Sequence, residues 1–331
     1  MGPRNPAIEQ QNMSSLSPPV TDSGSIPQIK FSFAMAHNRI EDGGWAREVT
    51  VRELPISKTL AGVNMRLGPG VVRELHWHKE AEWGYVLQGK ARVTIIDPDG
   101  RTFVDDVSEG DVWLFPAGFP HSIQGVGEEG TEFILVFNDG NFSENETLLL
   151  TEWFAHTPTD VLCKNFGIAP QVLKNIPPHE KYIFRASVPP SLEEVLSHLP
   201  GEQVPSPYTF HASQVVHTAY DGGTTLVIDD RNFPVTDMAA AINTLEPGAI
   251  REMHWHPHAD EWFYVVSGHL RVTVFNSVKN ARTWDFFPGD VGFIPKPWAI
   301  TSKTWATPRP ASSMSSTIPG LPTFRSTSGW R

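Results

Sequence analysis

The sequence predicts an all-β protein built as two tandem jelly-roll β-barrels that are joined by a short helical linker, with the second barrel incomplete. Three observations predict this fold. A stretch that begins at Val63 recurs from Ala241, apolar residues alternate within each copy, and Gly- and Pro-rich turns separate the short apolar runs. A chain of 331 residues is long enough for two such domains, each with its own core.

The internal repeat is long and almost without gaps. The stretch VNMRLGPGVVRELHWHKEAEWGYVLQGKARVTIID realigns with AINTLEPGAIREMHWHPHADEWFYVVSGHLRVTVFN. His76 corresponds to His254 (254 − 76 = 178) and Glu82 to Glu261 (261 − 82 = 179), so one residue is inserted between them. A period of this length far exceeds the roughly 20–50 residues of solenoid repeats, and it therefore indicates a duplicated domain.

The pattern along the chain divides it into five segments. Strand-like alternation is clearest in Ala91-Val93-Ile95 and Leu270-Val272-Val274, whereas Leu148–Phe154, Val161–Phe166 and Leu192–Leu199 favour short helices among prolines. We expect an N-terminal extension over 1–40, a first barrel with its lid over 41–147, a helical linker over 148–205, an incomplete second barrel over 206–295 and a non-homologous tail over 296–331.

Composition excludes several classes of partner. A formal net charge of −11 argues against nucleic acid and anionic membranes, and no apolar run is long enough to cross a bilayer. The single cysteine, Cys163, rules out an intrachain disulfide. The N-terminus lacks the apolar core of a signal peptide, so the chain is expected inside the cell by default, or secreted if a leader precedes Met1. Homo-oligomerisation is permitted but not specified.

Four residues of the first repeat form a candidate metal site. His76 and His78 are two apart on a strand and so face the same side, Glu82 follows, and a Pro/Gly turn returns the chain to His121. Three imidazoles and one carboxylate leave two positions open in an octahedral site, which suits Mn or Fe, and zinc is compatible with the ligands alone. The alternative is a pair of half-buried strand histidines. Recurrence of the pair with a following carboxylate favours the metal.

These residues resemble the two motifs of the cupin family. The first motif corresponds to Gly70-x5-His76-x-His78-x3-Glu82-x6-Gly89 and the second to Gly110-x5-Pro116-x-Gly118-x2-His121, although Gly125 stands where Asn is frequent. More narrowly, the duplication, RELHWHKEAEW and FSENET resemble the bicupin oxalate decarboxylases of fungi and bacteria, from about Gly2 to Pro295. This resemblance implies an Mn(II) enzyme that converts oxalate to formate and carbon dioxide, with dioxygen as a co-catalyst that is not consumed.

Arg73 and the segment after the strand Phe133–Asn138 are the other candidate site residues. Arg73 lies three residues before His76, recurs as Arg251, and could bind a small dianion, the alternative being a surface salt bridge. The polar segment has the character of a movable lid, and the resemblance implies that Glu144 is its acid and base. Its other residues are Ser143, Asn145, Glu146 and Thr147, and Glu146 stands where related lids often carry Ser. The alternative is a solvated loop before a helix, with Ser143 as N-cap.

The second repeat carries only three of the four ligands. His254, His256 and Glu261 recur, but the position expected for the fourth (121 + 179 = 300) is Ile300. From Lys296 the chain shows no apolar alternation, so we expect the second barrel to lack its final strands and its site to bind metal weakly or not at all.

A shifted reading frame would explain this tail. Reading each codon one nucleotide earlier permits M-G-H-Y-I-E-N-V-G-D in this region, which is similar to the surroundings of the fourth ligand in the family. We hypothesise a frame displacement near Lys296–Trp298. An uninterrupted transcript that encodes the residues printed here would contradict it.

Three functions remain open at this point. They are a manganese oxalate decarboxylase acting at the first site, an oxalate oxidase that makes peroxide, and a non-catalytic storage-type bicupin. The lid glutamate argues against the oxidase, and the complete ligand set argues against the storage protein.

Overall fold

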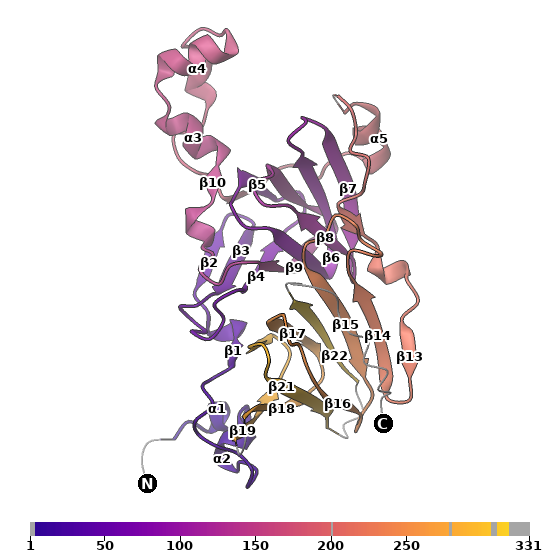
Figure 1. The fold of residues 1–331 in the computed structure, drawn as a ribbon. Helices are drawn as coiled ribbons and strands as arrows, with labels where there is room; N and C mark the ends of the chain where they lie inside the picture. Colours follow the sequence, from indigo (N-terminus) through magenta and orange to yellow (C-terminus); the bar gives the residue numbers. More distant parts are fainter. Residues whose placement is uncertain (1–3, 200, 278–279, 306–309, 318–331) are drawn as a thin grey trace.

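The computed structural model describes residues 4–199, 201–277, 280–305 and 310–317. Two β-rich domains lie one above the other, and a helical segment projects from the first (Figure 1). The strands of the first domain are β2 (Asn38–Glu41), β3 (Gly44–Val49), β4 (Ala61–Leu67), β5 (Val72–Trp77), β6 (Glu82–Ile96), β7 (Thr102–Ser108), β8 (Val112–Phe115) and β9 (His121–Phe137). Those of the second are β13 (Thr218–Tyr220), β14 (Gly223–Ile228), β15 (Ala239–Leu245), β16 (Ile250–Trp255), β17 (Glu261–Ser267), β18 (Leu270–Ser277), β19 (Asn280–Phe286), β20 (Asp290–Ile294), β21 (Ala299–Thr304) and β22 (Ala311–Thr317). The predicted all-β class is confirmed.

Short elements connect the two domains. The N-terminal extension contains α1 (Pro6–Gln10), α2 (Met13–Leu16), β1 (Lys30–Ser32) and a 3₁₀ turn, η1 (Phe33–Met35). After β9 come η2 (Glu144–Glu146), β10 (Leu148–Leu149), α3 (Leu150–His156), α4 (Thr159–Phe166), η3 (Val172–Asn175), β11 (Ile183–Phe184), α5 (Leu192–Ser197), β12 (Thr209–Phe210) and η4 (Ala212–Gln214). The predicted helical character of the linker is therefore present. Within the described residues, no helix is long and apolar enough to cross a membrane.

The two domains use the same strand pattern with different continuity. In the first domain, β6 and β9 are long antiparallel partners that run through both layers of the jelly roll, so its strands form one eleven-stranded network. In the described part of the second domain each of these long strands is replaced by two shorter ones. The strands β17 and β18 correspond to β6, and the strands β21 and β22 correspond to β9. Among the described residues, the strands of the second domain form two sheets, one of seven strands that includes β1 and one of four.

Each domain takes a strand from the segment that precedes the other. β1 of the N-terminal extension pairs antiparallel with β20 of the second domain, and β12 after the linker pairs antiparallel with β8 of the first. An apolar cluster that includes Trp83 and Leu114 of the first domain and Trp262 and Phe293 of the second fills the space between them. Burial of such large side chains stabilises the contact, so the two domains are packed together rather than loosely tethered.

His211, which follows β12, lies between two carboxylates of the first domain. Its Nδ1 is 3.1 Å from Asp111 Oδ2 and its Nε2 is 3.1 Å from Asp105 Oδ2. Partial burial opposes protonation, but the hydrogen bond to Asp111 and the charge of Asp105 outweigh it, so the pKa of His211 is raised. An imidazole that donates from both nitrogens must be protonated, which makes this contact of His211 with β7 and with the turn between β7 and β8 sensitive to pH.

We expect His211→Ala to lower the free energy of unfolding by about 0.5–1 kcal/mol at pH 6, because the imidazolium is partly exposed and screened by solvent. Because the pKa of His211 is higher in the folded state, its protonation stabilises the fold. The stabilisation is complete below the pKa of the unfolded state, about 6.5, and it is lost as the pH rises through the pKa of the folded state. The difference between wild type and variant should therefore shrink above neutral pH in urea unfolding curves. A difference that grows with pH would contradict the assignment, and His198→Ala, on an exposed helix end, is the control.

The expectation that the second barrel lacks its final strands is wrong for the described part of the tail. Residues 299–304 form β21, which pairs with β16 and β18, and residues 311–317 form β22, which pairs with β15 and β17. Ile300, Ser302 and Thr304 are buried in turn along β21. Small hydroxyl side chains, Ser302 and Thr304, take two of these inward positions, and the Thr304 hydroxyl donates to the Glu246 carbonyl in the turn between β15 and β16. Residues 306–309 and 318–331 of the expected tail lie outside the described residues.

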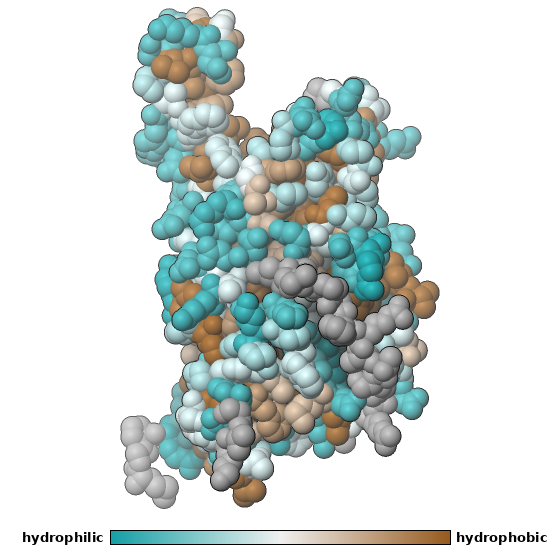
Figure 2. All heavy atoms as spheres, viewed as in Figure 1, coloured by the Kyte–Doolittle hydropathy of each residue, from teal (hydrophilic) through white to brown (hydrophobic). Residues whose placement is uncertain are grey.

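Helices α3 and α4 project away from both domain cores (Figure 1). Trp153, Val161 and Phe166 are exposed along them, and Figure 2 shows apolar surface at the end of this projection. The base of the projection is held near the candidate metal site, because the ring of Trp153 packs edge-on against Trp77 of β5 with centroids 5.5 Å apart.

Candidate metal centre and lid

The structure brings the four predicted ligands of the first domain together. His76 lies on β5, His78 follows that strand, Glu82 opens β6 and His121 opens β9. One nitrogen or oxygen atom from each lies within 4.8 Å of the others, and all four side chains are buried. His76 and His121 are direct partners across the β5–β9 ladder, and the loop at His78 is tied to the turn before His121 by the bond from the Gly118 amide to the His78 carbonyl.

A β-bulge in strand β5 decides which side chains face this site. Arg73 pairs with Ile123 and His76 with His121, so three steps on β5 oppose two on β9. In regular pleating, residues three apart would face opposite sides of the sheet. The bulge removes this conflict, and Arg73 and His76 are both buried while Leu75 is exposed. The sequence spacing alone did not indicate this feature.

The three imidazoles are oriented by backbone carbonyls. Nδ1 of His76 donates to Glu74 O at 2.6 Å, Nδ1 of His78 to Glu80 O at 2.8 Å, and Nδ1 of His121 to Phe119 O at 2.7 Å. Protonation at Nδ1 leaves Nε2 as a lone-pair donor that points to the centre of the cluster. The buried His121 Nε2 has no hydrogen-bond partner within the described structure. A divalent metal ion would satisfy it, so the residues present fit a metal.

The charge of the cluster also suits a cation. Burial would raise the pKa of Glu82, but the adjacent His121 and His78 outweigh it and hold that pKa to about 2. Burial lowers the pKa of His76 well below its ordinary value, and Arg73 and the other two imidazoles lower it further. The cluster therefore holds an ionised carboxylate with at least one imidazole kept neutral, which are the protonation states that metal coordination requires.

Trp113 orients the ligand Glu82, a role that sequence analysis missed. Its indole Nε1 donates to Glu82 Oε1 at 3.3 Å, while Oε2 lies 3.2 Å from His78 Nε2. Trp113 is fully buried, and a Cβ at Gly84 would collide with its ring, so glycine at that position makes room for the indole. Gly84 and Trp113 are far apart in the sequence and become neighbours only when β6 pairs with β8, so the sequence alone could not connect them.

We expect Trp113→Phe to weaken manganese binding about 10-fold, because outer partners of metal ligands typically contribute 10–100-fold in affinity. The ring is kept and only the N–H donor to Glu82 is lost. Titration with Mn(II) followed by calorimetry measures the change. Trp83→Phe is the matched control, since Trp83 is equally buried and its Nε1 has no hydrogen-bond partner in the described structure. Equal affinity losses in both variants would refute the role of Trp113.

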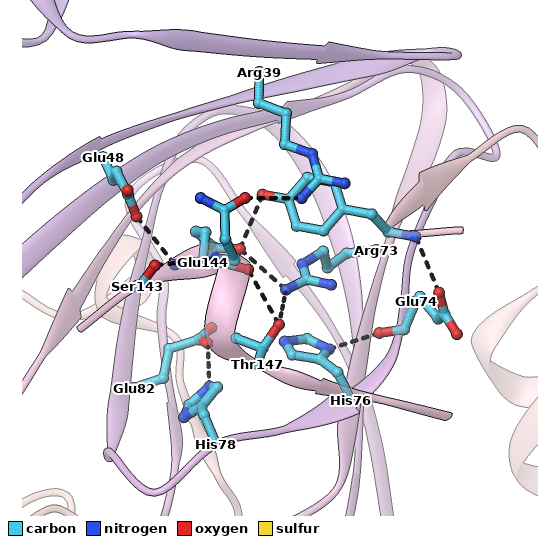
Figure 3. A network of polar contacts seen from close by, with 12 residues as sticks. Arg39, Glu48, Arg73, Glu74, His76, His78, Glu82, Ser143, Glu144 and Thr147 are labelled. Atoms are coloured by element: carbon cyan, nitrogen blue, oxygen red, sulfur yellow. Dashed lines mark hydrogen bonds and ion pairs between the residues drawn. The ribbon is translucent and has the colours of Figure 1, made fainter. Parts of the chain in front are cut away.

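Arg73 and Glu144 meet beside the histidine cluster. Arg73 Nη2 donates to Glu144 Oε2 at 3.0 Å and to Thr147 Oγ1 at 3.2 Å, and the Tyr182 hydroxyl donates to the same Glu144 oxygen at 2.9 Å. In Figure 3 the Glu144, Arg73 and Thr147 side chains lie together above His76 and His78. Arg73 thus makes a buried ion pair rather than the surface salt bridge that the sequence left open.

The lid segment, residues 143–147, is anchored at both ends by buried apolar side chains. Phe142 stacks on Phe137 with ring centroids 3.5 Å apart, and Leu149 pairs across strands with His76. Between these anchors Glu144 is only 5 % exposed, whereas Glu146 is exposed. The structure thereby distinguishes the two acidic lid residues, and Glu144 is the one that faces the cluster. Ser143 also caps the short η2 turn, accepting a bond from the Asn145 amide.

Tyr182 and Glu74 support the lid and were not predicted. Tyr182 is buried and has φ 55°, a conformation that is strained for a residue other than glycine. Glu74 Oε2 accepts from the amides of Lys181 and Tyr182 at 2.8 and 3.0 Å, which stabilises that conformation. Burial and the neighbouring Glu144 raise the pKa of Tyr182 well above its ordinary value, so its hydroxyl remains a donor.

Comparison with known proteins places the chain in a family. A cupin family model matches residues 31–174 and 209–303, one segment in each domain. This chain belongs to the cupin family. Oxalate decarboxylase OxdC of Bacillus subtilis (strain 168) is 53% identical over 294 residues, which cover 88% of this chain and 76% of that protein. A probable oxalate decarboxylase of Arthroderma benhamiae is 39% identical over 300 residues, covering 89% and 73%.

Solved structures agree with this assignment. Oxalate decarboxylase from Bacillus subtilis at pH 4.6 superposes with a TM-score of 0.93 at 50% identity, covering 96% of this cupin and 83% of that chain. A second structure of the Bacillus enzyme, from a study of its Mn(II) centres, gives a TM-score of 0.94 at 48% identity and covers 98% and 85%. The predicted membership of the bicupin oxalate decarboxylases is confirmed.

The second site of this bicupin has isoleucine where the first site has its fourth ligand. His254, His256 and Glu261 offer ligand atoms within 4.8 Å of one another, and His256 Nε2 lies 3.1 Å from Glu261 Oε2. Across the β16–β21 ladder His254 pairs with Ile300, which is the position that His121 occupies opposite His76 in the first domain. Arg251 Nη1 lies 4.0 Å from Glu261, so this arginine faces a ligand carboxylate rather than a lid. The second cluster therefore holds three candidate ligands among the described residues.

Proposed function

We propose that this bicupin catalyses manganese-dependent decarboxylation of oxalate to formate and carbon dioxide at the site in its first domain. The proposal is supported by relatives named oxalate decarboxylases and by a neighbour studied for its Mn(II) centres. One observation carries it. A buried lid carboxylate, Glu144, is held by Arg73 and Tyr182 beside a complete cluster of four metal ligands.

Arg73 is suited to bind the substrate carboxylate. Its Nη2 is occupied by Glu144 and Thr147, but its buried Nε and Nη1 have no partner in the described structure. Unsatisfied guanidinium donors in a buried site are costly, and a carboxylate oxygen of the substrate can accept a charge-assisted hydrogen bond from Nη1 or from Nε. Arg73 would hold one carboxylate of oxalate beside the ligand cluster, and its positive charge compensates locally for the acidic net charge of the chain.

Glu144 supplies the proton transfers. Conversion of mono-protonated oxalate breaks the C–C bond, releases carbon dioxide and forms one C–H bond, so the proton that leaves oxygen must return to carbon. A carboxylate that is buried beside the substrate can accept this proton and later donate it, provided that water is excluded. Manganese, when bound, supplies the Lewis-acid and redox chemistry, with dioxygen as a co-catalyst that is not consumed. Arg73 and Tyr182 keep the Glu144 carboxylate in position during both transfers.

One assay tests this function against its alternatives. Purified, manganese-loaded protein is given oxalate under air at acidic pH, and formate and hydrogen peroxide are measured together. Formate as the main product supports the decarboxylase, peroxide indicates an oxalate oxidase, and the absence of both indicates a non-catalytic bicupin. Repeating the assay without dioxygen should abolish formate production if dioxygen is a co-catalyst.

A further inference from the structure

Arg39 on strand β2 packs against the residue that holds Glu144 in place. Its guanidinium carbon lies 3.6 Å from the centroid of the Tyr182 ring, and that of Arg73 lies 4.2 Å from the same centroid. At such distances one face of a phenol ring has room for a single guanidinium, so the two arginines lie on opposite faces. Stacking on both faces confines the ring, whose hydroxyl donates to Glu144.

The same guanidinium also contacts the lid directly. Nη1 of Arg39 donates to Asn145 Oδ1 at 3.1 Å, and Asn145 is the residue that follows Glu144. The other two nitrogens are held by carboxylates, Nη2 by Glu180 at 2.8 Å and Nε by Glu41 at 2.7 Å. The planar guanidinium of Arg39 therefore joins strand β2, the segment before Tyr182 and the lid. Figure 3 shows Arg39 on the side of the lid away from His78.

A cleft outside the lid gives it room to move. The cleft has a volume of about 310 Å³ and is lined by Arg39, Glu48, Glu144, Asn145 and Tyr182 among others. The closed lid forms part of its wall, since Glu144 lines the cleft while its carboxylate bonds to Arg73 on the inner side. Movement of the lid into this space would break the Arg39–Asn145 bond, whereas the buried anchors Phe142 and Leu149 would stay in place.

We propose that Arg39 is a positioning residue that latches the lid in its closed conformation, through Asn145 directly and through Tyr182 on Glu144. The role of Arg39 in catalysis rests on the proposed function, whereas its role in holding the lid closed is independent of that function. A closed lid keeps water out and places the proton of Glu144 next to the substrate carbon. If the lid opens during turnover, one oxalate, one dioxygen and two protons can instead give two carbon dioxide and one hydrogen peroxide.

The latch is tested by hydrogen exchange on the 331-residue chain without added metal. In Arg39→Gln we expect the backbone amides of residues 143–148 to exchange about 5-fold faster than in wild type, since a charged hydrogen bond and a stacked cation are lost. Arg39→Lys keeps the charge without the planar fork and should be intermediate. Arg185→Gln is the matched control, because Arg185 makes one highly exposed ion pair, with Asp42, and should leave lid exchange unchanged.

Turnover provides a second, separate readout. With metal content unchanged, Arg39→Gln should raise the ratio of peroxide to formate about 3- to 10-fold and lower kcat more than it changes KM. Asn145→Ala, on the exposed lid, removes only the lid end of the bond and keeps the test decisive if Arg39→Gln does not fold. Lid exchange at the wild-type rate in Asn145→Ala and in any folded Arg39→Gln would overturn the latch. A wild-type protein that makes no formate would refute the proposed function, while hydrogen exchange would still decide on Arg39.

Discussion

Glu144→Gln is expected to reduce formate production about 10²- to 10⁴-fold, the range typical for loss of a general acid and base. The amide is nearly isosteric and can still accept from the Arg73 and Tyr182 donors that now hold the carboxylate. It cannot take the proton of oxalate or return a proton to carbon. Steady-state assays of formate, with manganese content measured on the same samples, separate a lost proton transfer from a lost metal.

The neighbouring lid carboxylate provides the control for this variant. Glu146 is exposed and accepts no bond from Arg73 or Tyr182 in the described structure, so Glu146→Gln should keep formate production within about 2-fold of wild type. The opposite pattern, with Glu146 required and Glu144 dispensable, would mean that the lid changes conformation before the reaction, so that Glu146 faces the metal ligands in place of Glu144. Full activity of Glu144→Gln would remove the lid acid from the proposed function altogether.

His121→Gln should lose at least about 100-fold in manganese affinity at the first site and, with it, formate production. Outer partners of metal ligands already contribute 10–100-fold, and His121 is itself one of the four ligands. Its ring also stacks on Phe115 at 4.1 Å, but the fold should persist, because the substitution leaves the strand pairing of β9 intact. Elemental analysis of protein after dialysis against Mn(II), together with circular dichroism, measures both effects.

A histidine away from the cluster tests whether this loss is specific. His156→Gln, on the exposed end of α3, should bind manganese as wild type does, with unchanged turnover. Wild-type manganese content and activity in His121→Gln would show that the metal is held elsewhere. If His121→Gln loses only part of its bound manganese but all of its formate production, the activity belongs to the first site. The manganese that remains would then be bound by His254, His256 and Glu261.

Local patterns in the sequence were sufficient for the fold class and for the ligand set. Alternating apolar residues encode strands because successive side chains face opposite sides of a sheet, and the repeat encodes a second domain of the same kind. His76 and His78 were correctly expected on one face of the chain, and the structure gathers them with Glu82 and His121. The family resemblance extended this reading to Glu144 and Arg73, which lie together beside that cluster.

Only the tertiary structure decided features that depend on partners distant in sequence. The bulge that turns Arg73 toward the site, the burial of Glu144 beside an exposed Glu146, and the stack of Arg39 on Tyr182 all require the strands and the lid to be in place. The same holds for β21, whose hydroxyl side chains show no apolar alternation and whose pairing is imposed by β16 and β18. The physical reason is that local spacing determines which side chains share a face, whereas backbone hydrogen bonds and burial by other segments determine what that face meets.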